Sequence, residues 1–164
     1  MKELVGKQSF HDHEYDFLWL GGVDYTQLTP VTQAYGFCYD QDGQLLVIQS
    51  QSQGNWQVPG GTIEPGETPI ETLRREIIEE ADTEIDDIQY LGTQQVTRED
   101  GYVVYQLRYA ARVTAVLPST IDPDKGYIRP RKFIEPKDFV EVSGWGEIGE
   151  EILRLSLEKM GISR

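Results

Sequence analysis

The sequence predicts a single domain of the mixed α/β class (α+β), because short β-rich runs flank one sharply bounded helix and a second helix closes the chain. Its 164 residues fit one domain, since domains of about 100 to 200 residues are the usual unit. Neither an internal repeat nor a low-complexity tract divides the sequence. We therefore expect one domain over residues 1–164, with residues 1–30 as an N-terminal extension or an extra strand.

Charge and composition exclude several classes of partner. The formal net charge is −13, from 28 acidic and 15 basic residues, so a nucleic acid polymer would be repelled. No apolar run reaches the roughly 20 residues of a membrane helix, and the N-terminus lacks the features of a signal peptide. We expect a cytoplasmic protein with no membrane partner. A small phosphorylated ligand stays compatible, because a bound divalent cation reverses the local field.

The N-terminal segment "FHDHEYDFLWLGG" alternates aromatic residues at Tyr15, Phe17 and Trp19. This pattern fits an extra strand, a base-stacking lid or a contact in a homodimer, and the sequence does not choose among them. His11 and His13, close to the terminus, are expected to be exposed bystanders and not metal ligands.

Further strands are predicted on both sides of the first helix. Two β-rich runs flank Asp42-Gly43, a pair that favours a tight primed hairpin turn, and a third ends in "NWQVP". After the helix, a hairpin is predicted around Glu99-Asp100-Gly101. Its second strand has apolar residues at every other position and is expected to form a core face: Val103, Tyr105, Leu107, Tyr109, Ala111, Val113 and Ala115.

The C-terminal part contains a predicted loop, a short strand and a closing helix. Leu117 to Lys132 has three prolines and no periodicity, and it precedes a short strand at 132–134. This loop also holds a basic cluster: Lys125, Arg129, Arg131 and Lys132. The closing helix is predicted over Glu147–Met160, before Gly161. Cys38, in apolar surroundings, is predicted to be a buried structural thiol.

The first helix has a sharply defined start. Thr68 to Glu71 forms a capping box with Pro69 at the first helical position. The apolar spacing then predicts a buried stripe of Ile70, Leu73, Ile77 and Ala81.

Three carboxylates share an arc beside that stripe, at Glu76, Glu79 and Glu80, with Arg75 at its edge. Like charges at such spacing destabilise a helix by about 0.2 to 0.5 kcal/mol per pair. Bound Mg²⁺ would explain them, since it prefers oxygen ligands. The alternative is the solvated face of an acidic protein.

The loop before the helix supports a site. Pro59-Gly60-Gly61 follows a strand and frees the backbone to approach a ligand, while Gly66 permits a turn that brings Glu67 to the helix start.

Loop and helix together resemble the Nudix box, G x5 E x7 R E U x E E x G U, where U is a bulky aliphatic residue. Six fixed positions agree: Gly61, Glu67, Arg75, Glu76, Glu79 and Glu80. The resemblance implies a Nudix-like αβα sandwich with a central mixed β-sheet. Asp82 replaces the second glycine and Thr83 an aliphatic residue. We expect Asp82 to hold a left-handed backbone conformation without taking part in the chemistry.

The resemblance also implies an activity. Nudix enzymes hydrolyse a nucleoside diphosphate linked to another group, with Mg²⁺ or Mn²⁺ as cofactor. Carried over, Glu76, Glu79, Glu80 and the Gly60 carbonyl would bind metal, while Glu67 would support the site. Arg75 would orient a catalytic glutamate, and Glu76 is the first candidate base. In the family the base can instead come from a later loop, where the choices are Glu99, Asp100, Asp122, Asp124 and Glu135.

The implied partner is a small-molecule nucleotide. Gly61, Arg129 and Arg131 are the expected substrate-binding residues, the arginines by holding phosphates. The alternative for the basic cluster is an ordinary solubilising loop. The rival for the whole protein is a catalytically silent Nudix-fold nucleotide sensor, which would be expected to have lost box carboxylates.

Overall fold

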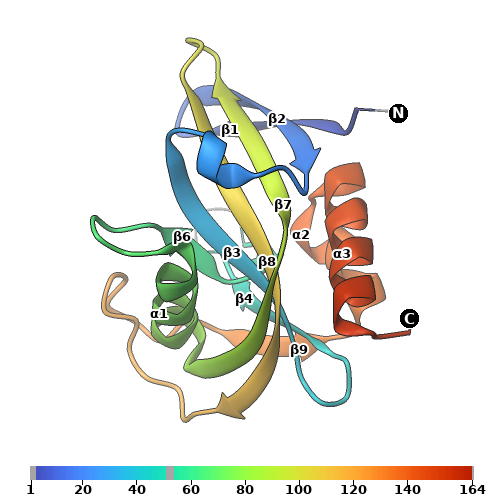
Figure 1. Ribbon diagram of the computed structural model, residues 1–164. Helices are drawn as coiled ribbons and strands as arrows, with labels where there is room; N and C mark the ends of the chain where they lie inside the picture. The colour runs from blue at the N-terminus through green and yellow to red at the C-terminus, as the bar shows by residue number, and fades with distance from the viewer. Residues whose placement is uncertain (1–2, 51–53, 164) are drawn as a thin grey trace.

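The computed structural model describes residues 3–50 and 54–163, so residues 1–2, 51–53 and 164 of the predicted domain lie outside it. Its described strands form one sheet (Figure 1). They are β1 Val5–Phe10, β2 His13–Gly21, β3 Val31–Tyr39, β4 Leu45–Gln49, β5 Trp56–Gln57, β6 Gly60–Thr62, β7 Thr83–Arg98, β8 Val103–Val116 and β9 Arg131–Ile134.

The sheet is mixed in strand direction. Its order is β1-β2-β7-β8-β3-β4-β5, with β6 paired to β3 and β9 to β4. β3 and β8 run parallel, whereas the other strand pairs are antiparallel. The prediction of a central mixed sheet is therefore confirmed.

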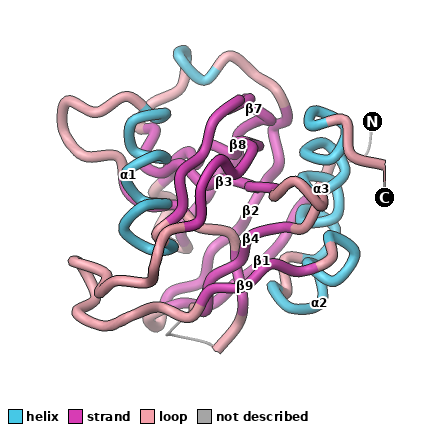
Figure 2. The backbone as a smooth tube through the Cα atoms, turned by 90° about the horizontal axis from the view of Figure 1, so that it is seen from below, coloured by secondary structure: helices cyan, strands magenta, loops and turns pink. Residues whose placement is uncertain are grey.

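Helices cover both faces of this sheet. α1 (Pro69–Ala81) lies on one side, and α2 (Phe139–Ser143) with α3 (Gly146–Met160) lies on the other (Figure 2). Short 3-10 turns occupy Tyr25–Gln27 and Pro136–Asp138. Two apolar clusters fill the spaces between the layers: one includes Leu73 and Ile77 of α1, and the other Ile148 and Ile152 of α3. The result is the predicted αβα sandwich.

The long strands are buried on both faces only where helices cover them. In β8, Leu107, Tyr109 and Ala111 belong to the cluster under α1, while Ala110 belongs to the cluster under α3. The predicted core face is therefore right at the middle of the strand. Toward its ends this face is only half-buried, at Val103, Tyr105, Val113 and Ala115. Cys38 is fully buried, as predicted, and burial raises the pKa of its thiol.

The prediction of a buried stripe on α1 is wrong at Ile70, a residue that is 41% exposed. Leu73, Ile77 and Ala81 are buried as expected, together with Glu76 and Glu80. The buried face is thus rotated toward the glutamates, because polar partners for their carboxylates lie under the helix.

The turn between β3 and β4 also differs from the prediction. A type I′ turn needs positive φ at both central residues and a type II′ turn needs it at the first, but of Asp42 and Gly43 only Gly43, the second, has it, at 75°. The Asp40 carboxylate accepts hydrogen bonds from the amides of Asp42 and Gln44, both at 2.9 Å. This local capping stabilises a longer turn.

The N-terminal segment joins the sheet. β2, which carries Tyr15, Phe17 and Trp19, pairs antiparallel with β7, and β1 pairs with β2. At the other end, α3 stops at Gly161, whose φ of 67° is left-handed. Among the described residues, no helix has the length and apolar character needed to cross a membrane.

Candidate functional site

The start of α1 is fixed by local hydrogen bonds. Thr68 Oγ1 accepts from the Glu71 amide at 3.2 Å, and Pro69 stands at the first helical position. Because this end is fixed, the side chains one to three turns later project from a defined place over β6.

Two glycines of β6 permit close contact between the loop and the helix. A Cβ on Gly60 would lie 2.3 Å from the Ala34 carbonyl oxygen, and a Cβ on Gly61 would lie 2.5 Å from a Glu76 carboxylate oxygen. The Gly60 amide donates to Glu80 Oε1 at 2.9 Å. The glycine pair therefore lets both glutamates reach the loop backbone.

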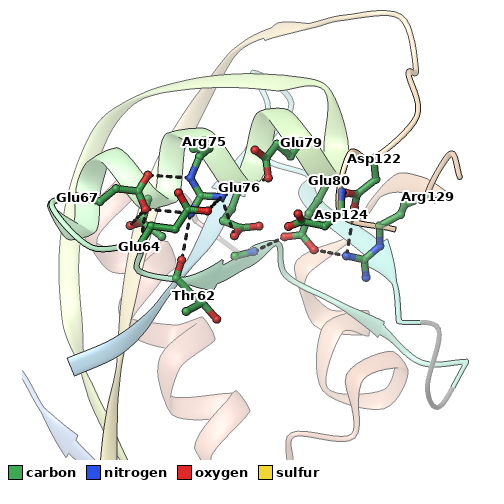
Figure 3. Close-up of polar contacts among 12 residues, drawn as sticks. Thr62, Glu64, Glu67, Arg75, Glu76, Glu79, Glu80, Asp122, Asp124 and Arg129 are labelled. Carbon is green, nitrogen blue, oxygen red and sulfur yellow. Dashed lines mark hydrogen bonds and ion pairs between the residues drawn. The ribbon is translucent and has the colours of Figure 1, made fainter. Parts of the chain in front are cut away.

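Arg75 joins several acceptors (Figure 3). Its Nε and one terminal nitrogen donate to both Glu67 oxygens at 2.7 and 2.9 Å. The other terminal nitrogen donates to Glu76 at 3.0 Å and Glu79 at 3.2 Å. A further bond reaches the Thr62 carbonyl at 3.0 Å. Such bidentate and shared contacts fix the directions of the carboxylates.

These carboxylates differ in their pKa values. Hydrogen bonds from Arg75 lower the pKa of Glu67 to about 2. Burial raises the pKa of Glu76 to about 7 and that of Glu80 to about 8, against the lowering effects of Arg75 and Arg129 respectively. Burial also raises the pKa of Glu79. The site thus holds carboxylates whose ionised form is poorly solvated, which a cation would stabilise.

The basic loop reaches the same site. Arg129 is buried, pairs with Glu80, lies 3.9 Å from an Asp122 oxygen, and donates to the Gln49 carbonyl at 3.1 Å. Arg131 instead donates to the carbonyls of Ala81, Asp82 and Leu117. Both guanidinium groups that the sequence assigned to phosphate binding thus already have partners within the protein.

The sequence offered five acidic residues after the helix as alternative bases. Two of them lie beside the glutamates of α1. Asp122 faces Arg129, and Asp124 places a carboxylate oxygen within 4.8 Å of oxygens of Glu76 and Glu79. The other three pair elsewhere: Glu99 with His13, Asp100 with Arg98, and Glu135 with Gln44. His13, at the start of β2, therefore contacts Glu99 in the turn between β7 and β8.

The donor set of Glu76, Glu79 and Asp124 fits a hard divalent cation, because its ligand atoms are carboxylate oxygens that converge. Glu80 lies beside this set, bonded to Gly60 and Arg129. The spacing of the sequence predicted Glu76 and Glu79 as members of this set. It could not select Asp124 from the five later acids, because a loop residue has no periodicity that predicts the direction of its side chain.

Both positions that depart from the box are buried. Asp82 has φ 46° and ψ 46°, the left-handed conformation predicted for it. Its carboxylate nevertheless has partners that the sequence did not suggest: Thr120 donates its amide at 2.8 Å and its hydroxyl at 2.5 Å. Thr83 satisfies its own hydroxyl by donating to the Ala81 carbonyl at 2.8 Å.

Solved structures share this fold. A mutant of a pyrophosphohydrolase of Bacillus subtilis matches with a TM-score of 0.69 at 18% identity, over 98% of this chain and 96% of that one. An Ap4A hydrolase of C. elegans matches with a TM-score of 0.59 at 19% identity, over 80% and 98% of the two chains. At such identities the likeness concerns the fold alone.

Curated relatives match shorter segments. The 8-oxo-dGDP phosphatase NUDT18 of Mus musculus is 31% identical over 108 residues, which cover 59% of this chain and 32% of that protein. An RNA pyrophosphohydrolase of Tolumonas auensis is 37% identical over 54 residues, 33% of this chain and 31% of that protein. The matched segments thus span about a third of each relative. The NUDIX domain model matches residues 29–155, more than half of the chain, and this protein therefore belongs to the Nudix family.

Proposed function

We propose that this protein is a metal-dependent pyrophosphohydrolase that cleaves the pyrophosphate linkage of a nucleoside diphosphate derivative. The products would be a nucleotide and a phosphorylated compound or pyrophosphate. The observation that carries the proposal is the convergence of Glu76, Glu79 and Asp124 beside the Gly60-Gly61 loop. Membership of a family of pyrophosphohydrolases supports hydrolysis of a phosphoric anhydride.

The proposed cofactor is Mg²⁺ or Mn²⁺, held by Glu76, Glu79 and Asp124, with Glu80 and the Gly60 carbonyl as further candidate ligands. When bound, such a metal neutralises phosphate charge and lowers the pKa of a coordinated water. The excess of carboxylates over guanidinium groups in this cluster supports a cation there.

Residues of the chain would orient the reaction. Arg75, held by Glu67 in a bidentate contact, fixes the carboxylate of Glu76, which remains the first candidate base. Asp124 is the alternative base from the later loop. Gly61 would let a phosphate approach, because a side chain there would meet the Glu76 carboxylate.

Arg129 and Arg131 remain proposed phosphate-binding residues, although each guanidinium group already has partners within the protein. Arg129 would have to share its guanidinium with Glu80, and Arg131 with the carbonyls at the end of α1. Binding by Arg129 fits this condition better, since it already lies among the site carboxylates.

The proposed substrate is a small nucleotide. The names of the relatives point to two kinds of substrate, 8-oxo-dGDP and RNA. The net charge of −13 disfavours extended contact with a polyanion, so we favour the small molecule. An RNA 5′-triphosphate belongs in the same screen, because it offers the same anhydride.

The rival function is a nucleotide sensor without catalysis. Retention of Gly61, Glu67 and Arg75, together with the three helix glutamates, favours an enzyme. A sensor would have no need for six correctly spaced positions.

The test is a screen of nucleoside diphosphate derivatives with Mg²⁺ and with Mn²⁺, in which phosphate is detected directly or after phosphatase treatment. Glu79→Gln should lower turnover at least about a hundredfold, because stabilisation of charge by a metal is worth several kcal/mol. Glu84→Gln, an exposed acid on β7, is the matched control and should keep the activity of the parent. Tight nucleotide binding without product under either metal would replace this proposal by the sensor.

A further inference from the structure

We propose that Asp82 is a positioning residue that fixes the loop after β8 on the end of α1, so that Asp124 lies beside Glu76 and Glu79. Here "the loop" means residues 117–130. The inference rests on the proposed role of Glu76, Glu79 and Asp124 as metal ligands. It assigns a function to Asp82, which is not one of the six positions shared with the Nudix box.

Asp82 contacts the start of the loop through both its carbonyl oxygen and its carboxylate. Its carbonyl oxygen accepts from the Leu117 amide at 2.8 Å. Its carboxylate accepts from the Thr120 amide at 2.8 Å and from the Thr120 hydroxyl at 2.5 Å. Asp82 is only 9% exposed, whereas Thr120 is exposed, so the bonds between them are partly buried. One residue at the helix end therefore anchors the loop at two points, Leu117 and Thr120.

The far end of the loop is anchored at the same place. Arg131, the first residue of β9, donates to the carbonyls of Ala81, Asp82 and Leu117. Entry and exit of the loop thus meet at the last turn of α1, and the residues between them have to return to that helix.

An internal turn then directs Asp124. The Asp122 carboxylate accepts from the Asp124 amide at 2.9 Å, and the Asp122 carbonyl accepts from Gly126 at 2.8 Å. The same carboxylate lies 3.9 Å from Arg129, which pairs with Glu80. Four residues of extended chain span at most about 14 Å, so an anchor at Thr120 limits where Asp124 can lie.

The residue type at position 82 supports this role. Glycine would adopt the left-handed conformation without steric conflict, whereas Asp holds it under strain. Glycine would also keep the carbonyl bond to Leu117 but lose both bonds to Thr120. What the carboxylate adds is therefore the second anchor of the loop.

The test compares metal binding in four single variants by calorimetric titration of Mn²⁺, without substrate. Asp82→Gly should weaken Mn²⁺ binding about tenfold, as loss of a residue that orients a ligand commonly does. Asp124→Asn, which alters a proposed ligand itself, should weaken it at least as much. Asp82→Asn keeps one acceptor for Thr120 and should fall between Asp82→Gly and the parent. Asp87→Gly, which replaces another left-handed Asp with φ 50°, is the matched control and should bind like the parent.

A double variant tests whether Asp82 acts through Asp124. In the Asp124→Asn background, Asp82→Gly should weaken Mn²⁺ binding by less than about twofold, because residues that act as one unit do not add. Full additivity would overturn the inference, as would unchanged Mn²⁺ affinity in Asp82→Gly.

Amide hydrogen exchange supplies a readout without metal or activity. In Asp82→Gly the Thr120 amide should lose protection while the Leu117 amide, bonded to the backbone carbonyl, keeps it. Protected Thr120 in this variant would overturn the anchor. If these effects hold while the substrate screen is blank, the inference stands and the proposed hydrolase does not.

Discussion

The two faces of the sheet bury charges of opposite sign. Under α1, Glu76 and Glu80 are 8% and 9% exposed, and the carboxylates of the cluster outnumber the guanidinium groups of Arg75 and Arg129. On the face toward α3, Arg108 is 3% exposed and forms no ion pair with a carboxylate of the described chain. The α1 face is therefore rich in negative charge, and the α3 face holds a buried guanidinium group.

Neutral groups accommodate Arg108. It donates to the amide oxygens of Gln94 at 2.8 Å and Gln106 at 2.9 Å. Its guanidinium carbon lies 4.9 Å from the ring centre of Tyr35 and 5.2 Å from that of Trp145. Burial lowers the pKa of Arg108 to about 10, which leaves it charged at neutral pH. Dipoles and aromatic faces therefore balance this charge.

Among the described residues, carboxylates that converge closely enough to hold a metal ion gather on the α1 face only. The surroundings of Arg108 are complete apart from its Nε, which has no partner within residues 3–50 and 54–163. The α1 face instead has several acids of raised pKa around one point, so its charge is balanced best by a cation. Substitutions on each face test this contrast.

We expect the greatest loss of activity from a substitution at Glu76. Glu76→Gln should lower turnover at least about a hundredfold, through loss of metal charge at the reacting phosphate. Burial raises the pKa of Glu76 to about 7, so the ionised form is unfavourable in the metal-free fold. The metal-free variant should accordingly unfold at the parent's temperature or above it at pH 8, which calorimetry checks. A large loss of thermal stability would mean that this carboxylate stabilises the fold and not a metal.

The next effect compares a glycine on each face. Gly61→Ala should weaken Mn²⁺ binding about tenfold, because the new Cβ would lie 2.5 Å from the Glu76 carboxylate and displace it. Gly6→Ala on β1 is the matched control, since its Cβ would lie at an ordinary 3.5 Å from Ile148 of α3. If both variants bound Mn²⁺ with the affinity of the parent, Glu76 would not be a metal ligand.

A stability effect is expected on the α3 face. Arg108→Lys keeps the charge but loses the planar group and its forked donors, so unfolding free energy should fall by about 1 to 3 kcal/mol. In a chain of this size each kcal/mol corresponds to about 2 to 4 °C in Tm. Arg154→Lys, on the exposed side of α3, should change Tm by much less. If Arg108→Lys were neutral, the aromatic and amide contacts would not explain how this charge is buried.

The smallest expected effect is at Arg131. Arg131→Gln should lower unfolding free energy by about 1 kcal/mol, because bonds to the carbonyls at the end of α1 are lost. Lys125→Gln, an exposed change in the same loop, should leave stability unaltered. A salt-sensitive rise in KM for Arg131→Gln, with Tm unchanged, would show instead the phosphate contact that the sequence predicted.

Local chemistry explains what could be predicted from the sequence. The start of α1 was predictable because the Thr68 cap acts on a residue three positions away. The end of α3 was predictable because Gly161 takes a conformation that other residues adopt only with strain. The grouping of Glu76, Glu79 and Glu80 followed from the period of the helix. Only the resemblance to the Nudix box converted this grouping into an expected enzyme.

Long-range pairing explains what could not be predicted. Ile70 is exposed and Glu80 buried, because the partners of Glu80, Gly60 and Arg129, come from β6 and from the loop after β8. The forked donors of Arg108 meet acceptors on two strands, and its rings come from β3 and the start of α3. Side-chain periodicity gives the direction of a residue within its own element and says nothing of the element that will lie against it.

Local sequence is enough to specify the carboxylate helix, its glycine loop and the left-handed end at Asp82, because each depends on backbone preferences and spacings within about 25 residues. Three contacts depend on the tertiary structure. Asp124 lies beside Glu76 and Glu79, Arg129 pairs with Glu80, and the Asp82 carboxylate accepts hydrogen bonds from Thr120. The last two contacts join residues 49 and 38 positions apart. They form because the described sheet brings β9 and the end of β8 to the last turn of α1, where buried polar groups need partners.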